Sequence, residues 1–368
     1  SGDILKQPDL AKTLQRIADQ GPAGFYEGET AALIEKEMKA HGGLITMADL
    51  KAYQAKKRGV ITGTYRGYDI YGMPPPSSGG IALVQMLNVL EGFDLKANGY
   101  GAAKNLHLEA EAMRRAFADR ARYLGDPDFE KEMPVPQLIS KDYAAQLRKT
   151  INPNKASKSS SSSFTFTYES PETTHISIVD AKRNAVSLTY TLEYGYGSRI
   201  VVPGAGFLLN NEMGDFNAAP GLTDDRGLIG TDANLARPGK RMLSSMSPTI
   251  IAKDGQLFMV SGSPGGRTII NTVLGTILNV IDFGMNVQDA IDAPRFHHQW
   301  LPNQIDYERQ GFSPDTLREL EKRGHVLKPG GGQGVAQVII VNGEEDVLEG
   351  GTDRRVPDGG AVAVTPKR

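Results

Sequence analysis

Residues 173–193, TTHISIVDAKRNAVSLTYTLE, are the part of the chain that indicates its fold most clearly. Polar and apolar residues alternate in 174–179 and again in 185–192, and a short polar turn lies between the two runs. This pattern is typical of an antiparallel hairpin, in which facing residues have a constant sum of numbers. Thr173 and Thr191 are equally distant from the middle of the turn, so we expect their hydroxyl groups to face each other at the open end.

The functional meaning of this threonine pair is open at this point. Threonine is a common strand residue and cross-strand threonine pairs are frequent, so the pair also fits a purely structural role. His175 is close to Thr173 in sequence, but we expect its side chain to alternate away from that residue. No G-x-S-x-G motif occurs, so nothing in the pattern supports a Ser/His/Asp triad.

Three further clusters could carry chemistry. The glycine-rich turn 262–266, GSPGG, lies between an expected strand and an expected helix, where main-chain N–H groups can bind an anion or a developing oxyanion. Ser244 and Ser245 precede a strand and could hold a carboxylate. The carboxylates of 210–216, NNEMGDF, could bind an ammonium group. Each cluster also fits an ordinary loop, a tight turn or a turn cap.

Composition excludes several classes of protein. Lys and Arg number 41 and Asp and Glu 43 among 368 residues, so the net charge is −2 and no general basic field is available for nucleic acid. The 39% hydrophobic content is that of a globular protein with a sizeable core. The absence of cysteine excludes disulfides and thiolate metal sites. No run of 18 apolar residues occurs, so we expect no membrane span, and no signal peptide is visible.

The type of secondary structure that the sequence predicts changes along the chain. We expect helices at 8–40 (in two pieces), 81–90, 102–123, 268–283 and 287–293, a hairpin at 60–73, and strands at 174–179, 185–192, 248–252, 257–260 and 335–341. The polar stretch 152–163, NPNKASKSSSSS, indicates an exposed, flexible linker and the one clear boundary. A mostly helical first part and a second part of strands with helices predict an α+β layered sandwich.

A metal centre is not expected. His297 and His298 are adjacent, but neighbouring residues in a strand or loop point apart, and no Asp, Glu or His completes a ligand spacing near them. We therefore expect neither a metal nor another cofactor.

Several segments, in order along the chain, resemble the small subunit of γ-glutamyltranspeptidases. They are ETTHISIVD (172–180), NAVSLTYTLEYGYGSRIVVPGAGFLLNNEMGDF (184–216), PGKRMLSSMSPTI (238–250), GSPGGRTIINTVLGTILNVIDFGM (262–285) and APRFHHQWLPNQI (293–305). Upstream, GGLITMADLKAY (42–53), YRGYDIYGMPPPSSGGIALVQ (65–85) and YLGDPDF (123–129) resemble the C-terminal half of the large subunit of that family. The resemblance covers nearly the whole chain and is closest to bacterial members.

The resemblance implies a fold and a maturation step. The fold is the N-terminal nucleophile hydrolase type, a four-layer αββα sandwich. A precursor cuts itself before a threonine, here between Glu172 and Thr173, and the freed α-amino group then helps to activate the threonine hydroxyl. The cut leaves 1–172 and 173–368, which pair as a heterodimer within one αββα domain. The family also implies a periplasmic or secreted location.

The resemblance further implies a role for each residue of the site. In that assignment Thr191 hydrogen-bonds the nucleophile Thr173, Gly265 and Gly266 supply the oxyanion hole, Ser244 and Ser245 hold the substrate α-carboxylate, and Asp215 binds the α-ammonium with Glu193 and Glu212. We expect Glu193 to lie on the same strand as Thr191, two residues further on, and therefore on the same face. Three carboxylates that converge on one site repel one another unless a cation lies among them.

The chain departs from the family pattern at four places. Position 193 is Glu where many members have Asn, and position 212 is Glu where some have Gln. Within 220–238, which corresponds to the lid, Arg226 stands where some relatives carry an aromatic gate. The first half of the usual large subunit, with its glycine-rich opening segment and the arginine that pairs with the substrate carboxylate, has no counterpart in this sequence. We therefore expect either a piece of a longer protein or a truncated member of the family.

The function expected from the resemblance is γ-glutamyl acyl transfer. Thr173 would attack the γ-amide of glutathione or a related γ-glutamyl compound, and water, an amino acid or a peptide would take the acyl group. One alternative is an acylase of the same family that acts on glutaryl β-lactams or poly-γ-glutamate. A second alternative is an inactive truncated precursor, or a half-domain that only pairs with a missing partner segment.

Overall fold

The computed structural model describes residues 2–160, 173–217, 220–221, 230–357 and 359–364. The chain divides into two compact units. The first consists of Ser1–Arg58 and Tyr194–Asn211, and the second of Gly59–Glu193 and Glu212–Arg368.

The first unit is built from the N-terminal helices and a segment that returns later in the chain. Its helices are α1 (Pro8–Gln20), α2 (Ala23–Tyr26), α3 (Gly28–His41) and α4 (Met47–Ala52). Ile34 and Met38 of α3 form a small core with Val202 and Ala205, and Thr13 donates a hydrogen bond to the main-chain oxygen of Ala205 (2.9 Å). The helices expected within 8–40 are confirmed.

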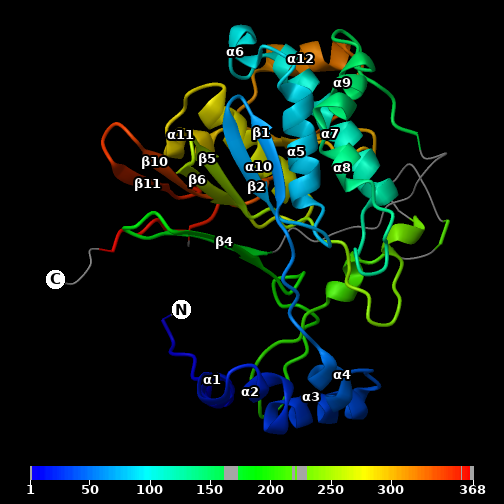
Figure 1. Cartoon of the computed structure of the whole chain (residues 1–368), viewed down its shortest axis with the longest axis vertical. Coiled ribbons are helices and arrows are strands. Elements are labelled where there is room, and N and C mark those ends of the chain that lie inside the picture. The colour runs from blue at the N-terminus through cyan, green and yellow to red at the C-terminus, as the bar shows by residue number, and fades with distance from the viewer. Residues whose placement is uncertain (1, 161–172, 218–219, 222–229, 358, 365–368) are drawn as a thin grey trace. The chain divides into compact units, whose positions relative to one another are not determined.

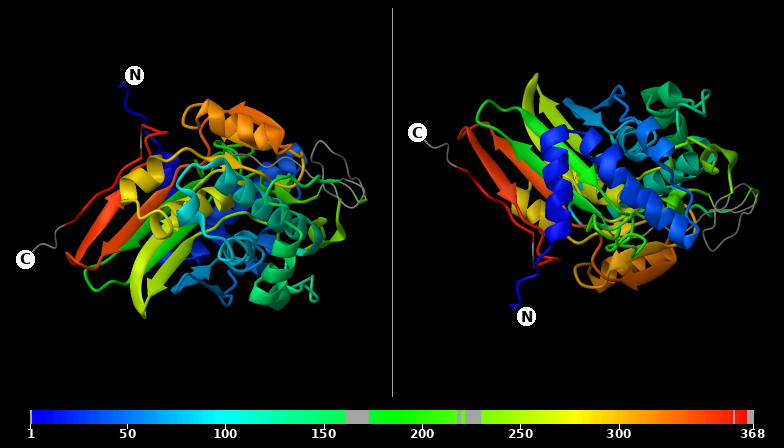
Figure 2. Two further views of the ribbon diagram at one scale, coloured as in Figure 1. Left: turned by 90° about the horizontal axis from the view of Figure 1, so that it is seen from above. Right: turned by 90° about the horizontal axis from the view of Figure 1, so that it is seen from below.

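A six-stranded antiparallel sheet is the centre of the second unit. Its strands, in spatial order, are β1 (Ile61–Tyr65), β2 (Tyr68–Gly72), β5 (Thr249–Lys253), β6 (Gln256–Gly262), β10 (Gln337–Asn342) and β11 (Val347–Gly351). The hairpin expected at 60–73 and the strands expected at 248–252 and 257–260 are confirmed. The two hairpins turn at Arg66-Gly67 and Asp254-Gly255, and all four turn residues have positive φ, as tight two-residue hairpin turns require. Figure 2 shows the strands of this sheet side by side.

Helices cover one face of this sheet (Figure 1). Helices α5 (Gly79–Leu90) and α10 (Thr268–Ile281) pack against the strands, α7 (Ala103–Tyr123) packs on α5, and α11 (Val287–Asp292) contacts β10 and β11. Every residue of α5 is buried, because the helix has the sheet on one side and other helices on the other. None of the helices in the described part of the chain is long and apolar enough to cross a membrane.

Short elements complete the second unit. They are α6 (Leu95–Asn98), α8 (Val135–Leu138), α9 (Lys141–Lys149), α12 (Pro314–Lys322), the 3-10 helices η2 (Glu212–Asp215) and η3 (Asp232–Asn234), and a small sheet of β7 (Phe296–His297), β8 (Ile305–Glu308) and β9 (Leu327–Gly330).

A two-stranded ribbon, β3 (Thr174–Val179) and β4 (Ala185–Tyr190), packs on the other face of the sheet. Ser187 donates a hydrogen bond to the main-chain oxygen of Ser261 in β6 (3.0 Å), and Ser177 donates one to that of Gln337 in β10 (2.9 Å). The α+β class and three of the four predicted layers are therefore present. On the outer face of the ribbon, Ile178 and Val186 are 53% and 51% exposed, so the described residues of this unit do not supply the second helical layer.

The predicted linker 152–163 is partly packed in the structure, and residues 161–163 lie outside the described part. Ala156 is buried, and its main-chain N–H donates to the oxygen of Arg323 (2.7 Å). Ser157 donates from its hydroxyl to Glu111 of α7 (2.5 Å). The expected exposure is therefore wrong for Ala156 and Ser157, because the main-chain oxygen of Arg323 and the carboxylate of Glu111 bind their amide and hydroxyl groups. The two units also divide the chain at other positions than this linker.

Candidate active site

A small pocket in the second unit gathers most of the predicted site residues. Its lining consists of Thr173, Thr191, Glu193, Glu212, Asp215, Ser244, Ser245, Met246, Gly266 and Ile269. They come from the open end of the ribbon, where β3 begins and β4 ends, from η2, from the segment before β5 and from the turn that leads into α10. Gly265 is next to the pocket in sequence but does not line it. Glu172 and Arg226 lie outside the described residues.

The threonine pair has the register that the hairpin pattern predicts. Thr174 faces Tyr190 in the ladder, so Thr173 and Thr191 follow as the next facing pair. The hydroxyl of Thr173 donates a hydrogen bond to Oγ1 of Thr191 (3.3 Å), and the main-chain N–H of Glu193 donates to the same oxygen (2.8 Å). Thr191 therefore holds the hydroxyl of Thr173 at the mouth of the ribbon.

Glu193 reaches the pocket in a different way from the one expected. Strand β4 ends at Tyr190, and Glu193 has φ = 73°, in the left-handed region. The shared-strand argument is therefore wrong, since the chain turns sharply after Thr191. Gly214 makes room for this side chain: a Cβ at that position would lie 2.6 Å from Oε1 of Glu193. The sequence offered no sign of this close approach.

Three carboxylates line the same pocket, as the resemblance to the family implies. Glu212 and Asp215 lie at the two ends of η2 and Glu193 packs against Gly214 between them. Asn234 fixes this short helix, because its Nδ2 donates to the main-chain oxygen of Asp215 (2.7 Å) while its Oδ1 accepts from the N–H of Leu243 (2.9 Å). Such a cluster favours a positively charged group.

The paired serines are held by residues that the sequence did not identify. The main-chain N–H of Ser244 donates to the oxygen of Pro76 (2.9 Å), and the N–H of Ser78 donates to the oxygen of Ser244 (2.8 Å). Buried Arg120 of α7 donates to the hydroxyls of both Ser78 (2.9 Å) and Ser245 (2.8 Å). The sequence feature that could have pointed to Arg120 is its position on the buried side of the long helix α7.

The glycine-rich turn has the position predicted for it, between β6 and α10. Gly265 and Gly266 have φ values of 134° and 54°, which side chains disfavour. A Cβ at Gly265 would lie 2.6 Å from Oγ1 of Thr268 and 3.0 Å from Cα of Gly334. The turn is therefore restricted to glycine by its backbone and by its neighbours.

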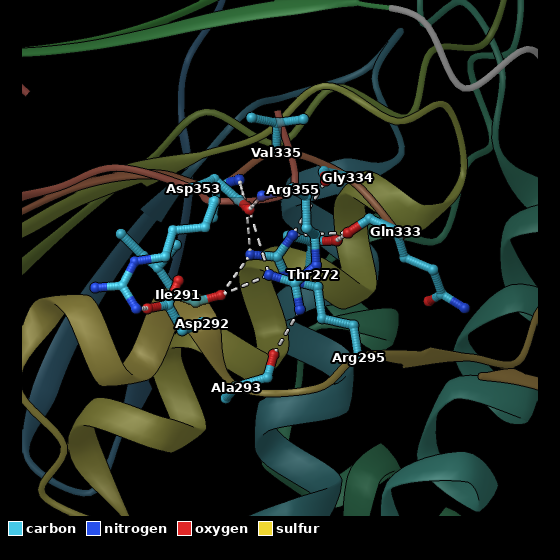
Figure 3. Close-up of polar contacts among 12 residues, drawn as sticks. Thr272, Ile291, Asp292, Ala293, Arg295, Gln333, Gly334, Val335, Asp353 and Arg355 are labelled. Atoms are coloured by element: carbon cyan, nitrogen blue, oxygen red, sulfur yellow. Dashed lines mark hydrogen bonds and ion pairs between the residues drawn. The ribbon is translucent and has the colours of Figure 1, made fainter. Parts of the chain in front are cut away.

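A buried charge network holds the loop against which this turn packs (Figure 3). Arg295 donates to the main-chain oxygens of Gln333 (2.7 Å) and Gly334 (3.1 Å), and it forms an ion pair with Asp353 (2.7 Å). Asp353 also accepts the N–H of Ala336 (2.8 Å). Arg295 and Asp353 therefore bind three main-chain groups of the loop beside Gly265.

His175 does not alternate away from Thr173. Residues two apart in a strand share a face, and His175 is buried on the side of the ribbon that packs on the sheet, against Gly262. Its Nδ1 lies 2.7 Å from Oγ1 of Thr189, and burial lowers its pKa to about 4. His175 is therefore neutral at pH 7 and engaged with Thr189.

One cluster of the described residues has the geometry of a metal site: His107, Glu111 and His325. The ring atoms Nδ1 of His107 and Nε2 of His325 are 2.8 Å apart, as in a hydrogen bond. Although burial alone would raise it, the pKa of Glu111 is lowered to about 2 by its neighbours, with Arg114 foremost. The carboxylate is thus already neutralised, and we interpret the cluster as a polar network of the protein itself.

Comparison with known proteins identifies the family. The family model for gamma-glutamyltranspeptidase matches residues 1–363. The chain belongs to the gamma-glutamyltranspeptidase family. It is 51% identical to the glutathione hydrolase proenzyme of Escherichia coli (strain K12) over 97% of this chain and 61% of that protein. It is 39% identical to the acylase ACY 1 proenzyme of Pseudomonas sp. (strain V22) over 89% of this chain and 56% of that protein.

A solved structure supports the same conclusion for the fold. The cephalosporin acylase from Bacillus halodurans superposes with a TM-score of 0.86 at 30% identity, over 100% of this chain and 64% of that one. The α+β fold of the N-terminal nucleophile hydrolase type is therefore confirmed for this gamma-glutamyltranspeptidase family member. The chain spans about three fifths of the length of the curated relatives named above.

Proposed function

We propose that this chain carries the catalytic site of a γ-glutamyl acyltransferase and hydrolase, with Thr173 as the nucleophile. The observation that supports the proposal best is the single pocket shared by the threonine pair, the three carboxylates and the two serines. These groups match the parts of a γ-glutamyl substrate: an ammonium, a carboxylate and an amide carbon to be attacked. The whole protein's substrates would be glutathione or other γ-glutamyl compounds, with water, amino acids or peptides as acceptors.

The first proposed reaction is self-cleavage. Oγ1 of Thr173 attacks the carbonyl carbon of Glu172, the C–N bond breaks, and the nitrogen takes up the proton that the hydroxyl loses. Water then hydrolyses the ester, which leaves a carboxyl group on Glu172 and a free α-amine on Thr173. That amine becomes the base that activates the same hydroxyl for substrate. The two products, 1–172 and 173–368, stay together as a heterodimer.

The second proposed reaction is acyl transfer. Thr173 attacks the γ-carbonyl carbon, the leaving amine departs with a proton, and the ester is then attacked by water or by an acceptor amine. Main-chain N–H groups of Gly265 and Gly266 stabilise the oxyanion. Asp215, with Glu193 and Glu212, binds the α-ammonium, while Ser244 and Ser245 bind the α-carboxylate.

Substrate binding requires the pocket to open. Its volume is about 20 Å³, which is room for about one water molecule. A γ-glutamyl group is much larger, so the side chains around Thr173 must separate to admit it.

By analogy with the family, we place the whole protein in the periplasm or outside the cell.

A glutaryl or poly-γ-glutamyl acylase is the second candidate function. Two of the similar proteins are an acylase ACY 1 proenzyme and a cephalosporin acylase. The three carboxylates favour the γ-glutamyl reaction, because a glutaryl group has no ammonium for them to bind.

Two measurements test the proposal. A mass spectrum of the purified protein should give two chains that meet at Glu172 and Thr173, and the protein should release p-nitroaniline from γ-glutamyl-p-nitroanilide faster than from the glutaryl analogue. One uncut chain without turnover would instead support an inactive precursor or half-domain, and faster glutaryl cleavage would support the acylase.

Arg120→Gln should weaken binding of γ-glutamyl-p-nitroanilide. Gln cannot replace a charged donor that holds both Ser78 and Ser245, so the carboxylate-binding hydroxyl of Ser245 loses its position. Such bonds contribute about 1.5–3 kcal/mol, and we expect KM to rise about tenfold or more with a smaller change in kcat. Arg122→Gln, an exposed change on the same helix, is the matched control. An unchanged KM for Arg120→Gln would contradict the positioning role.

Gly265→Ala should lower turnover by about 10²–10³. Alanine disfavours φ = 134°, and its Cβ would collide with Thr268, so the turn that presents the oxyanion donors must shift. The matched control is Gly275→Ala in α10, where an added Cβ meets nothing within 4 Å. Steady-state kcat on γ-glutamyl-p-nitroanilide measures the effect in both variants. Equal kcat in Gly265→Ala and wild type, with the fold intact, would refute the oxyanion role.

A further inference from the structure

A second, larger cavity lies in the same unit and shares no lining residue with the active-site pocket. Its volume is about 340 Å³. Residues of α7, α10, the loop after α11 and the segment 311–316 form its walls. Helix α10 contributes to both sites, with Ile269 at the active-site pocket and Gly275 at this cavity.

An acidic side chain lines this cavity without a counter-charge. Glu109 of α7 is 7% exposed, and no hydrogen bond or ion pair joins its side chain to the other described residues. Burial, with a smaller contribution from the charge of Asp282, raises its pKa to about 8. A buried carboxyl without a partner is costly to fold around, and such groups in cavities are candidates for binding sites.

Two other polar side chains of the cavity already have partners. Arg295 also lines the wall, but it pairs with Asp353 and donates to the main-chain oxygens of Gln333 and Ile291. The hydroxyl of Thr276 donates to the main-chain oxygen of Thr272 (2.8 Å). Glu109 is an ionisable side chain of this cavity without a partner among the described residues, and a cationic hydrogen-bond donor would stabilise its ionised form.

Aromatic and aliphatic side chains form much of the remaining wall. Tyr100, Phe283, Phe296 and Phe312 all contribute, and the rings of Tyr100 and Phe283 meet edge to face with centroids 5.4 Å apart. Aromatic rings attract cations as well as apolar groups. Such walls suit a ligand with a compact apolar body.

We propose that this cavity is a binding site for a small primary ammonium compound with an aryl or branched alkyl body, in which the ammonium pairs with Glu109 and the body packs against the aromatic wall. The site is distinct from the pocket around Thr173 and does not depend on the function proposed for that pocket.

Isothermal titration with benzylamine at pH 7 tests the proposal, with benzyl alcohol as the neutral analogue of nearly the same shape. Benzylamine should bind with one site per chain and more tightly than the alcohol. Glu109→Gln should weaken benzylamine binding about tenfold or more, since a charge-assisted hydrogen bond is lost, and should leave the affinity for the alcohol unchanged. No saturable amine binding, or equal amine affinity in wild type and Glu109→Gln, would overturn the proposal.

Two further variants locate the binding site. Gly275→Leu places a side chain into the open cavity from α10 and should abolish benzylamine binding, whereas Gly275→Ala leaves most of the volume and should retain it. Asp215→Asn, in the active-site pocket, should bind benzylamine as wild type does. If Asp215→Asn loses binding and Gly275→Leu keeps it, the amine occupies the active site and the proposed cavity site is wrong.

Discussion

Thr173→Ala should remain one uncut chain and should not turn over γ-glutamyl-p-nitroanilide. Without Oγ1 nothing can attack the carbonyl carbon of Glu172, and no acyl-enzyme can form on substrate. Loss of a catalytic nucleophile costs on the order of 10⁴–10⁶ in kcat, so activity should fall to the background rate. Denaturing mass spectrometry detects the uncut chain, and the anilide assay measures the residual turnover.

Two variants serve as controls for this result. Thr173→Ser keeps a hydroxyl at the same place and should still cut itself. Thr174→Ala changes the exposed neighbour on β3 and should leave both cutting and turnover close to wild type. A Thr173→Ala protein that still splits before residue 173 would exclude this threonine as the group that performs the cut.

Asp215→Asn should reduce the preference for γ-glutamyl over glutaryl substrates. Asn keeps the shape of the side chain but removes one of the charges that attract the α-ammonium. Loss of one partner of a buried charged hydrogen bond costs about 2–5 kcal/mol, so the ratio of kcat/KM for γ-glutamyl and glutaryl p-nitroanilide should fall by about 30-fold or more. The glutaryl compound lacks the ammonium, so its own kcat/KM should change much less.

Asp232→Asn is the matched control for charge, because Asp232 begins η3 and does not line the pocket. It should leave the substrate ratio unchanged. A lower thermal stability of Asp215→Asn with an unchanged ratio would show that Asp215 only supports η2, and the acylase function would then gain support.

Local patterns predicted the longer helices, most strands of the large sheet and the central contact of the site, whereas short elements such as α9, α12 and β7–β9 were not predicted. The alternation on either side of 180–184 predicted β3, β4 and the facing of Thr173 with Thr191, because a hairpin with a short turn has one register. Gly67 and Gly255 close the two tight hairpins of the sheet at positive φ. The glycine-rich turn before α10 was predicted from its place between a strand and a helix.

Arguments from local pattern failed where the backbone left regular structure. Glu193 was expected on a strand, but the chain turns into the left-handed region just after Thr191. His175 was expected to point away from Thr173, although the two-residue period puts them on one face. Residues 156–157 lie in a polar, linker-like stretch, yet Glu111 and Arg323 bind them.

Tertiary contacts bring the site residues together in one pocket and hold them in position. The residue types of Thr173, Asp215 and Ser245 suggested chemistry, and the resemblance to the family suggested their roles. Their presence in one pocket depends on the packing of the ribbon, η2 and α10, and on Arg120 reaching Ser245 from a helix far away in the sequence. The sequence likewise does not predict that the carboxyl of Glu109 has no partner among the described residues. A helix pattern indicates which residues are buried but not which side chains they contact. Hydrogen bonds and ion pairs between distant segments are set by the packed structure as a whole, whereas strands, helices and turns follow from neighbours along the chain.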